Sequence, residues 1–280
     1  ARLWCSLGHY DAEDGFRIDG VTGPDEYSAI ADNNVYTNLL AQRNLEAAAA
    51  AVDRQPDRAA ELGVVPDEQA VWRRAASKML VPWDEKLGVH PQSERFTEHD
   101  RWDFASTTPD QYPLLLSFTY FDLYRKQVVK QADLVLALHV RGDAFTDEQK
   151  ASDFEYYEAL TVRDSSLSAA TQAVIAAEVG HLELAYDYFG EAAFMDLHDL
   201  ENNTRDGVHI ASLAGTWIAA VAGFGGMRDH GGVLTFAPRL PSRLERLTFG
   251  LLVRGTQLRV QSTKTEATYS VLDGAPLGLV

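Results

Sequence analysis

Cysteine is almost absent from this sequence of 280 residues, in which Cys5 is the single thiol. One cysteine excludes an intramolecular disulfide. So little use of cysteine is also typical of proteins from reducing compartments. We therefore expect a cytoplasmic protein.

Long apolar runs and basic residues are scarce as well. No stretch approaches the roughly 18 apolar residues that a membrane-spanning helix needs, and no signal-peptide pattern opens the sequence. Basic residues number 25 against 41 acidic ones, which gives a net charge of −16. Because this charge repels nucleic-acid phosphates and anionic lipid headgroups, we expect neither nucleic acid nor a membrane as a partner.

Apolar residues, in contrast, make up 46% of the sequence. That share supports a large hydrophobic core and argues against disorder. The length suits one large domain, or a domain with a small module. The sequence starts with Ala1 rather than Met, and both ends read like the interior of an element, so we expect a piece of a longer protein.

Helical patterns dominate residues 1–230. Asp32 is the predicted N-cap of the first long helix, Thr146 and Gln149 form a predicted capping box, and Gly180 is a predicted helix end. Helices are predicted at 33–52, 66–80, 112–127, 146–158, 168–178, 181–195 and 206–223.

After about residue 230 the apolar period changes from helical to alternating. Turns are predicted at Gly255-Thr256 and Asp273-Gly274. Strands are predicted at 232–236, 247–253, 257–262 and 267–272. We therefore predict a helical domain over residues 1–230 and a small antiparallel β module over residues 231–280.

One loop has the composition of a catalytic site. Gly23-Pro24 forces a turn that presents Asp25 and Glu26 next to Tyr27. A carboxylate in a rigid turn can have the raised pKa that a general acid needs near neutral pH. A helix-capping Asp-Glu pair explains the same residues, and their chemistry leaves both interpretations open.

Two further clusters suit ligand binding. Lys130 and Gln131 offer several hydrogen-bond donors and an acceptor for sugar hydroxyls. The alternative is an exposed helix surface, where a Lys-Gln pair is common. Ser165 and Ser166 stand beside a predicted helix start, where an anion can bind. Ser168 alone, as an N-cap, is the alternative, but it leaves the two preceding serines unexplained.

Aromatic side chains accompany Arg and Glu at residues 90–96 and 101–104. This mixture suits sugar recognition and equally suits the packing of a long loop. We interpret these segments as an acceptor-side loop or a domain interface.

The string Gly23-Pro-Asp-Glu-Tyr27, followed by Asp32-Asn-Asn34 and Tyr36-Thr-Asn38, resembles the acid loop of glycoside hydrolase family 65. That family includes maltose, trehalose and kojibiose phosphorylases. The strings Lys130-Gln-Ala-Asp133 and 206–217 are similar to the family too. The resemblance implies a mainly α fold: the later part of an (α/α)6 barrel, followed by a small antiparallel β-sandwich module. The family's N-terminal β-sandwich and first barrel helices are absent from this sequence.

The resemblance also implies roles for single residues. Glu26 corresponds to the catalytic acid, and Lys130 and Gln131 correspond to residues that hold the transferred glucosyl unit. The family's phosphate site maps onto Ser165, Ser166, His209 and Ser212, although a helix start with a packed Trp explains the last two as well. Inorganic phosphate would be a co-substrate, with neither a metal nor an organic cofactor, and the whole protein would be a homodimer.

The implied reaction is inverting phosphorolysis of an α-glucosyl disaccharide to β-glucose 1-phosphate. In hydrolytic relatives a Glu in the region of the serine cluster Arg163–Ser168 activates water, whereas this sequence has serines there and only Asp164 as an acid. Phosphate is already an anionic nucleophile and needs positioning more than deprotonation, so the serines favour phosphorolysis. With Asp164 as base, an inverting hydrolase such as a trehalase is the alternative, and a non-catalytic carbohydrate-binding remnant is a second. We expect these 280 residues alone to lack turnover.

Overall fold

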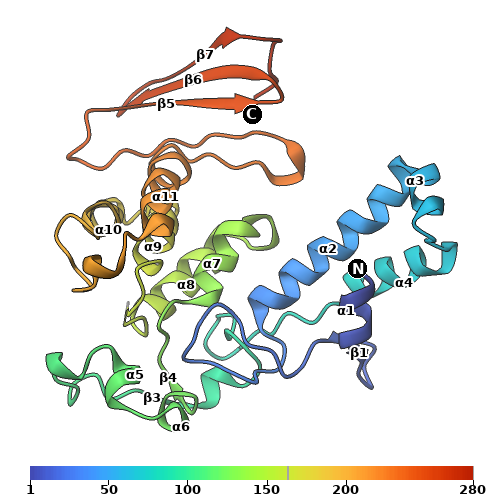
Figure 1. Ribbon diagram of the computed structural model, residues 1–280, viewed down its shortest axis with the longest axis horizontal. Coiled ribbons are helices and arrows are strands. Elements are labelled where there is room, and N and C mark those ends of the chain that lie inside the picture. The colour runs from blue at the N-terminus through green and yellow to red at the C-terminus, as the bar shows by residue number, and fades with distance from the viewer. Residues whose placement is uncertain (163, 280) are drawn as a thin grey trace. The chain divides into compact units, whose positions relative to one another are not determined.

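The computed structural model describes residues 1–162 and 164–279, and most of its regular structure is helical (Figure 1). The chain divides into two compact units. The first comprises Ala1–Arg141 with Glu155–Asp164, and the second comprises Gly142–Phe154 with Ser165–Val280. The prediction of a mainly α chain with a small C-terminal antiparallel sheet is confirmed. The barrel and the domain boundary near residue 230 stay predictions.

The first unit combines one long helix with short helices and two-residue strands. Its elements are α1 (Arg2–Leu7), β1 (His9–Tyr10), β2 (Phe16–Arg17), α2 (Val35–Arg54), α3 (Pro56–Glu61), α4 (Pro66–Ser77), η1 (Phe96–Glu98), β3 (Asp100–Arg101), η2 (Pro109–Gln111), α5 (Leu114–Ser117), α6 (Tyr120–Leu123), β4 (Lys126–Gln127) and α7 (Asp133–Val140). Strands β1 and β2 pair antiparallel, and β3 and β4 pair parallel. The division between the two units falls within α8 (Asp147–Glu158).

Helix α2 begins two residues later than predicted because a different side chain caps it. Asn34 accepts a hydrogen bond from the backbone N–H of Thr37 at 3.0 Å, which satisfies one free donor of the first turn. Asp32, the predicted cap, instead accepts a hydrogen bond from the Gly20 N–H at 2.9 Å. The prediction of Asp32 as the N-cap is therefore wrong, although the helix itself is confirmed.

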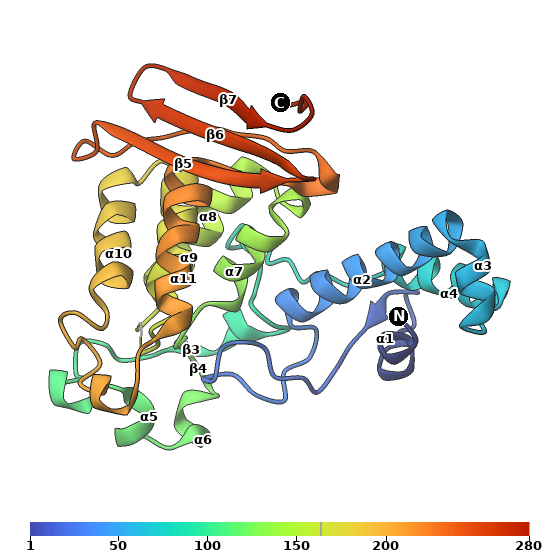
Figure 2. The ribbon, with the colours of Figure 1, turned by 45° about the horizontal axis from the view of Figure 1, so that its top comes forward.

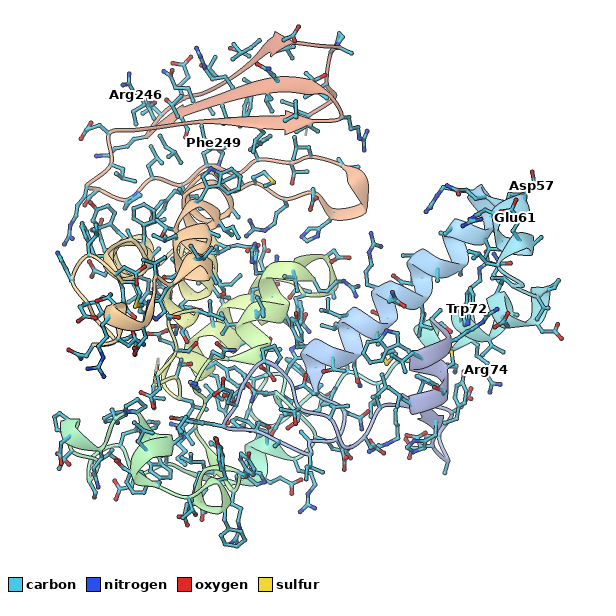
Figure 3. The ribbon with its side chains drawn as sticks, in the orientation of Figure 1. Asp57, Glu61, Trp72, Arg74, Arg246 and Phe249 are labelled. Atoms are coloured by element: carbon cyan, nitrogen blue, oxygen red, sulfur yellow. The ribbon has the colours of Figure 1, made fainter. Side chains whose placement is uncertain are left out.

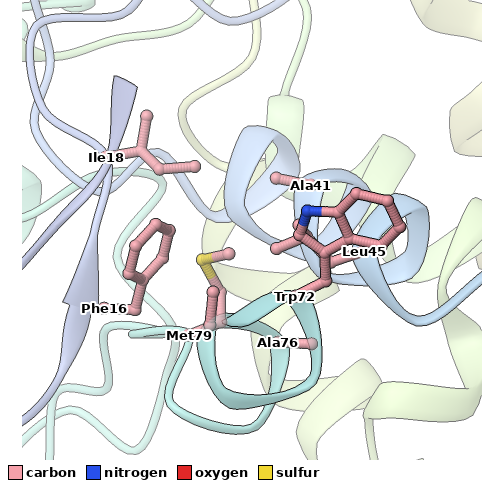
Figure 4. Close-up of a cluster of buried hydrophobic side chains, with 8 residues drawn as sticks. Phe16, Ile18, Ala41, Leu45, Trp72, Ala76 and Met79 are labelled. Atoms are coloured by element: carbon pink, nitrogen blue, oxygen red, sulfur yellow. The ribbon is translucent and has the colours of Figure 1, made fainter. Parts of the chain in front are cut away.

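Helices α2 and α4 pack side by side and share a core with the β2 region (Figures 1 and 2). Trp72, which Figure 3 labels on α4, is 6% exposed. Each large side chain buried in this way contributes about 1.5–3 kcal/mol of hydrophobic stabilisation. Figure 4 shows this cluster, which consists of Phe16, Ile18, Ala41, Leu45, Trp72, Ala75, Ala76 and Met79.

The helix predicted over residues 112–127 does not form. Two one-turn helices, α5 and α6, replace it, and Phe118 between them has extended backbone angles of φ −127° and ψ 155°. The bend lets Leu114 and Leu123 both enter a second core with Tyr27 and Trp102. Tyr27, the last residue of the Gly23–Tyr27 loop, is part of this core.

The second unit consists of helices followed along the chain by a three-stranded sheet. Its elements beyond α8 are η3 (Gly142–Ala144), α9 (Ser168–Glu178), α10 (Leu182–Phe194), η4 (Thr204–Asp206), α11 (Ile210–Ile218), η5 (Ala219–Phe224), η6 (His230–Gly232), β5 (Arg246–Val253), β6 (Thr256–Thr263) and β7 (Ala267–Asp273). The Thr146–Gln149 capping box is confirmed by reciprocal hydrogen bonds of 2.9 and 3.2 Å. Gly180 follows α9 with φ +97°, the conformation expected of a glycine at a helix end.

The sheet has the order β5-β6-β7, and both pairings are antiparallel. Along β6, buried residues alternate with exposed ones, as expected where one face is covered. Phe249 of β5 (Figure 3) lies so close to Gly225 that a Cβ at Gly225 would be 2.9 Å from its ring. The strand predicted at 232–236 is wrong, because Gly231 and Gly232 have φ of +64° and +78° and leave a single bridge between Arg228 and Thr235.

Within the described residues, no helix is both long enough and apolar enough to span a membrane.

Candidate functional site

The turn that carries Glu26 is possible only with glycine at position 23. A Cβ on Gly23 would lie 2.0 Å from Oδ2 of Asp133 and 2.8 Å from Nδ2 of Asn34. Both contacts are far shorter than van der Waals distance, so any side chain here would push the loop away. The loop therefore approaches the start of α7 more closely than any other residue type would permit.

Glu26 contacts Lys130, a partner that the sequence pattern also singled out. Its Oε2 lies 2.6 Å from the Lys130 Nζ, and the Glu26 side chain is 59% exposed while that of Lys130 is 15% exposed. Gln131 donates from Nε2 to the Pro24 carbonyl at 2.6 Å. The structure thus brings Glu26, Lys130 and Gln131 together within the first unit, although more than 100 positions separate Glu26 from Lys130.

Asp25, the residue before Glu26, is fully buried. Its Oδ1 accepts hydrogen bonds from the backbone N–H groups of Tyr27 and Lys130 at 3.1 and 2.9 Å, and its Oδ2 accepts one from Nε2 of Gln92 at 2.8 Å. Burial raises the pKa of Asp25 to about 6, against which these hydrogen bonds act. The raised pKa expected of this loop therefore belongs to a carboxyl that solvent does not reach.

Tyr27, the residue after Glu26, is 1% exposed and anchors the other side of the loop. Its hydroxyl donates to Oδ2 of Asp164 at 2.6 Å and accepts from the Leu115 N–H at 3.2 Å. Burial raises the pKa of Tyr27, and the hydrogen bond to Asp164 acts in the same direction, so the phenol stays a donor. The same Oδ2 of Asp164 accepts from the Leu114 N–H at 2.8 Å.

Asp164, the alternative base, is therefore already engaged as an acceptor of two hydrogen bonds that hold the Tyr27 side of the loop. Arg163, which begins the serine cluster in the sequence, lies outside the described residues.

In the second unit, the serine cluster precedes α9 but does not cap it. Ser168 is the first residue of α9, and the N-cap position belongs to Leu167, which makes no side-chain capping bond. The alternative in which Ser168 is the N-cap is therefore wrong. Ser165 Oγ accepts from the Leu167 N–H at 3.3 Å, and both Ser165 and Ser166 are partly exposed.

Helices α9 and α11 run in the same direction. A Cβ on Gly215 of α11 would lie 2.6 Å from the Ala170 Cβ, and a Cβ on Gly223 would lie 3.3 Å from the Cα of Val174. These two contacts follow the same order along both segments, and Figure 2 shows the helices side by side. Their N-termini, with Ser165 and Ser166 at one and His209 at the other, therefore lie at the same end of the helix pair. Two helix N-termini together favour an anion.

His209 occupies the N-cap position of α11, and Asp196 fixes its ring. Nδ1 of His209 lies 2.6 Å from Oδ1 of Asp196, and the His209 backbone N–H donates to Oδ2 at 2.9 Å. The hydrogen bond from His209 holds the pKa of Asp196 below its usual value, so Asp196 is an acceptor and Nδ1 carries the proton. Nε2 is then the ring nitrogen that can meet a ligand.

Ser212 differs from the other predicted phosphate ligands. Its side chain is fully buried, and its hydroxyl donates to the Ala192 carbonyl of α10 at 3.1 Å. In this arrangement Ser212 joins α11 to α10, and its hydroxyl does not face solvent.

Sequence reasoning missed Gln92 and gave no role to Asp133 beyond its place in the family string. Gly23, two residues before Asp25, was the available signal, because a glycine permits a close approach of the chain to another segment. Among residues 1–162 and 164–279, no group of three or more His, Cys, Asp or Glu side chains is arranged to hold a metal ion.

Comparisons with known proteins agree with this arrangement of motifs. A family model described as the glycosyl hydrolase family 65 central catalytic domain matches residues 1–218, and one described as the family's C-terminal domain matches residues 227–280. An uncharacterized glycosyl hydrolase of Mycobacterium tuberculosis is 55% identical over 98% of this chain and 35% of its own length. The α,α-trehalose phosphorylase of Thermoanaerobacter brockii is 39% identical over 99% of this chain and 37% of its own length.

A solved structure is also similar. It is that of a human-microbiome protein provisionally named a kojibiose phosphorylase, with a TM-score of 0.87 and 25% identity over 99% of this chain and 42% of that one. The chain thus spans a little over a third of the length of the curated relatives it matches. Because the central catalytic model alone matches more than half of it, the chain belongs to glycoside hydrolase family 65.

Proposed function

We propose that the whole protein carrying this chain catalyses inverting phosphorolysis of an α-glucosyl disaccharide of the trehalose, maltose or kojibiose type. The observation that supports this most strongly is the state of the two carboxylates near the loop. Glu26 is exposed and contacts Lys130, whereas Asp164 is engaged by Tyr27 and Leu114. Glu26 is therefore the carboxyl that is exposed toward a substrate, and phosphorolysis needs only one carboxyl.

In the proposed reaction Glu26 donates a proton to the bridging oxygen of the disaccharide. The bond from the anomeric carbon to that oxygen breaks with its electron pair, and the acceptor sugar leaves as an alcohol. A phosphate oxygen attacks the anomeric carbon from the opposite face and forms β-glucose 1-phosphate. General acid assistance of this kind contributes about 10²–10⁴ in rate.

The other predicted residues have binding roles. Lys130 and Gln131 donate hydrogen bonds to hydroxyls of the transferred glucosyl unit. Ser165, Ser166 and Nε2 of His209 bind phosphate. Their common position at two helix N-termini supports this role, because an acidic protein of net charge −16 needs concentrated local donors to hold an anion.

The decisive experiment supplies the whole protein with trehalose, maltose and kojibiose, each with and without inorganic phosphate. Phosphorus and proton NMR of the products would identify β-glucose 1-phosphate and its anomeric configuration. We expect turnover of one disaccharide that depends on phosphate. Free glucose formed at an undiminished rate without phosphate would show an inverting hydrolase, and binding without turnover would show a carbohydrate-binding remnant.

A further inference from the structure

Two buried carboxylates, those of Asp25 and Asp133, support the loop that carries Glu26, and one glutamine bridges them. Asp25 and Asp133 are both inaccessible to solvent, as is Gln92 between them. Gln92 donates from Nε2 to Oδ2 of Asp25 at 2.8 Å, and its Oε1 accepts from the Asp133 N–H at 3.1 Å. The Asp25 N–H donates directly to Oδ1 of Asp133 at 2.5 Å.

This network joins the segments that carry the proposed chemistry. On one side it holds Asp25, whose neighbour in the chain is Glu26. On the other it holds the backbone of Lys130, whose N–H donates to Oδ1 of Asp25 at 2.9 Å. Asn34, the N-cap of α2, donates from Nδ2 to Oδ2 of Asp133 at 2.7 Å, which ties the network to the longest helix of the unit.

Burial of the two carboxylates in this network costs free energy. A buried carboxylate loses much of its hydration, and burial raises the pKa values of Asp25 and Asp133. The charge of Asp25 raises that of Asp133 further. An apolar contact would join the same segments at lower cost, but it would not fix the direction of the backbone as five directional hydrogen bonds do.

We propose that Asp25 and Asp133, bridged by Gln92, are positioning residues. They fix the separation of Glu26 from Lys130, and so the orientation of the Glu26 carboxyl toward the bridging oxygen. The inference rests on the proposed role of Glu26 as the acid. Both carboxylates are inaccessible to solvent and therefore to substrate. Their effect passes through the backbone of the residues beside them, where a displacement of about 1 Å can cost on the order of 10² in rate.

A purely structural role predicts a different pattern of losses. If the network only stabilises the fold, its disruption lowers the amount of active protein and affects all substrates equally. If the network orients Glu26, the loss of rate depends on how much the leaving group needs protonation. A sugar alcohol needs it strongly, whereas fluoride leaves without it.

The test compares a disaccharide with α-glucosyl fluoride in the whole protein. With the fluoride, the carbon–fluorine bond breaks with its electron pair to give fluoride ion, and phosphate forms the new bond to the anomeric carbon. For Asp25→Asn we expect kcat on the disaccharide to fall by roughly 10²-fold and kcat on α-glucosyl fluoride by less than about tenfold. Equal losses on the two substrates would overturn the proposal.

Asp84→Asn is a matched control. Oδ1 of Asp84 also accepts from two backbone N–H groups, those of Lys86 and Leu87, and its Oδ2 also accepts from a side chain, the hydroxyl of Thr97. It belongs to the same unit but makes none of these bonds to Glu26 or Lys130. We expect both substrates to keep their wild-type rates in this variant.

Gln92→Met provides a second variant if Asp25→Asn does not fold. It fills a similar space without either hydrogen bond, and the same selective loss on the disaccharide is expected. The comparison of leaving groups holds whether phosphate or water attacks. A wild type that releases fluoride without phosphate would therefore refute phosphorolysis and still test the positioning role.

Discussion

Lys130 and Glu26 form an ion pair in which Nζ of the lysine lies 2.6 Å from Oε2 of the glutamate. The lysine is more buried than its partner, with 15% against 59% of the side chain exposed. A substrate hydroxyl that binds Lys130 must compete with this carboxylate for the ammonium group. Binding of the sugar and release of Glu26 for proton transfer are therefore linked in the proposed reaction.

Glu26→Gln should lower kcat of the whole protein on its natural disaccharide by roughly 10²–10⁴, the usual contribution of a general acid. The amide cannot donate a proton to the leaving oxygen as a carboxylic acid does. Folding should be intact, because 59% of the Glu26 side chain is exposed. Steady-state kinetics and the thermal unfolding midpoint measure the two effects.

Glu98→Gln is the control for this substitution. Glu98 is 61% exposed and pairs with Arg95 at 2.9 Å, so the same exchange removes a comparable ion pair at a position without a proposed role. Its kcat should be that of the wild type. A loss of less than about tenfold in Glu26→Gln would show that Glu26 is not the general acid.

Lys130→Ala should raise KM for the disaccharide, because the glucosyl unit loses a charged donor. A hydrogen bond to a charged group contributes about 1.5–3 kcal/mol, which corresponds to roughly 10- to 150-fold in KM. Initial rates over a range of disaccharide concentrations at saturating phosphate would measure it.

Lys126→Ala is the matched control, since Lys126 pairs with Asp100 at 3.1 Å in the same unit. Its KM should stay unchanged. A rise in the KM for phosphate alone after Lys130→Ala would contradict the assignment to the glucosyl unit.

Elements with strong local signals were predicted from the sequence. The helix at 168–178 has a glycine just past its end, and the strands near 247–272 alternate in burial, so neighbours in the sequence suffice to define them. Helix α7 escaped prediction because its apolar residues cover every side. Leu134 and Leu138 are buried on one side, and the apolar Leu136 and Val140 lie on the other side, so no helical period can be detected.

The residues of the candidate site could be predicted from the sequence, but the buried hydrogen bonds that hold them in place could not. The strings around Glu26 and Lys130 carry a family resemblance and are visible in one sequence. The bonds that connect Asp25 to Gln92 and to Asp133 span 67 and 108 positions. No local propensity encodes such distances, so the pairing of two buried acids emerges only from the fold.

Ser165→Ala, Ser166→Ala and His209→Ala should each raise KM for phosphate more than KM for the disaccharide. Each removes one proposed phosphate ligand from the end where α9 and α11 begin together, and a hydrogen bond to a charged group contributes about 1.5–3 kcal/mol. Kinetics with phosphate varied at saturating disaccharide, and then the reverse, separate the two constants.

Ser270→Ala is a control for these variants, because Ser270 lies in β7 of the same unit. Neither KM should change. If the three variants move only the KM for the sugar, the phosphate assignment is wrong.

Asp25 should make stability fall as pH rises through the weakly acidic range. Burial raises the pKa of its carboxyl from 3.8 to about 6, so the folded protein holds this proton more tightly than the unfolded chain. The free energy of unfolding then decreases between about pH 4 and pH 6 and levels off above. For this shift the loss from about pH 4 to pH 7 is about 2–3 kcal/mol.

Asp25→Asn removes this titration, so its deficit in stability relative to the wild type should be larger near pH 4 than near pH 7. Urea unfolding of the whole protein at both pH values, followed by tryptophan fluorescence, measures the difference. Asp84→Asn should show the opposite trend. Hydrogen bonds from Thr97 and from backbone N–H groups hold the pKa of Asp84 below its usual value, and its contribution is lost as pH falls. Parallel pH profiles for wild type and Asp25→Asn would show that the buried carboxyl does not titrate in this range.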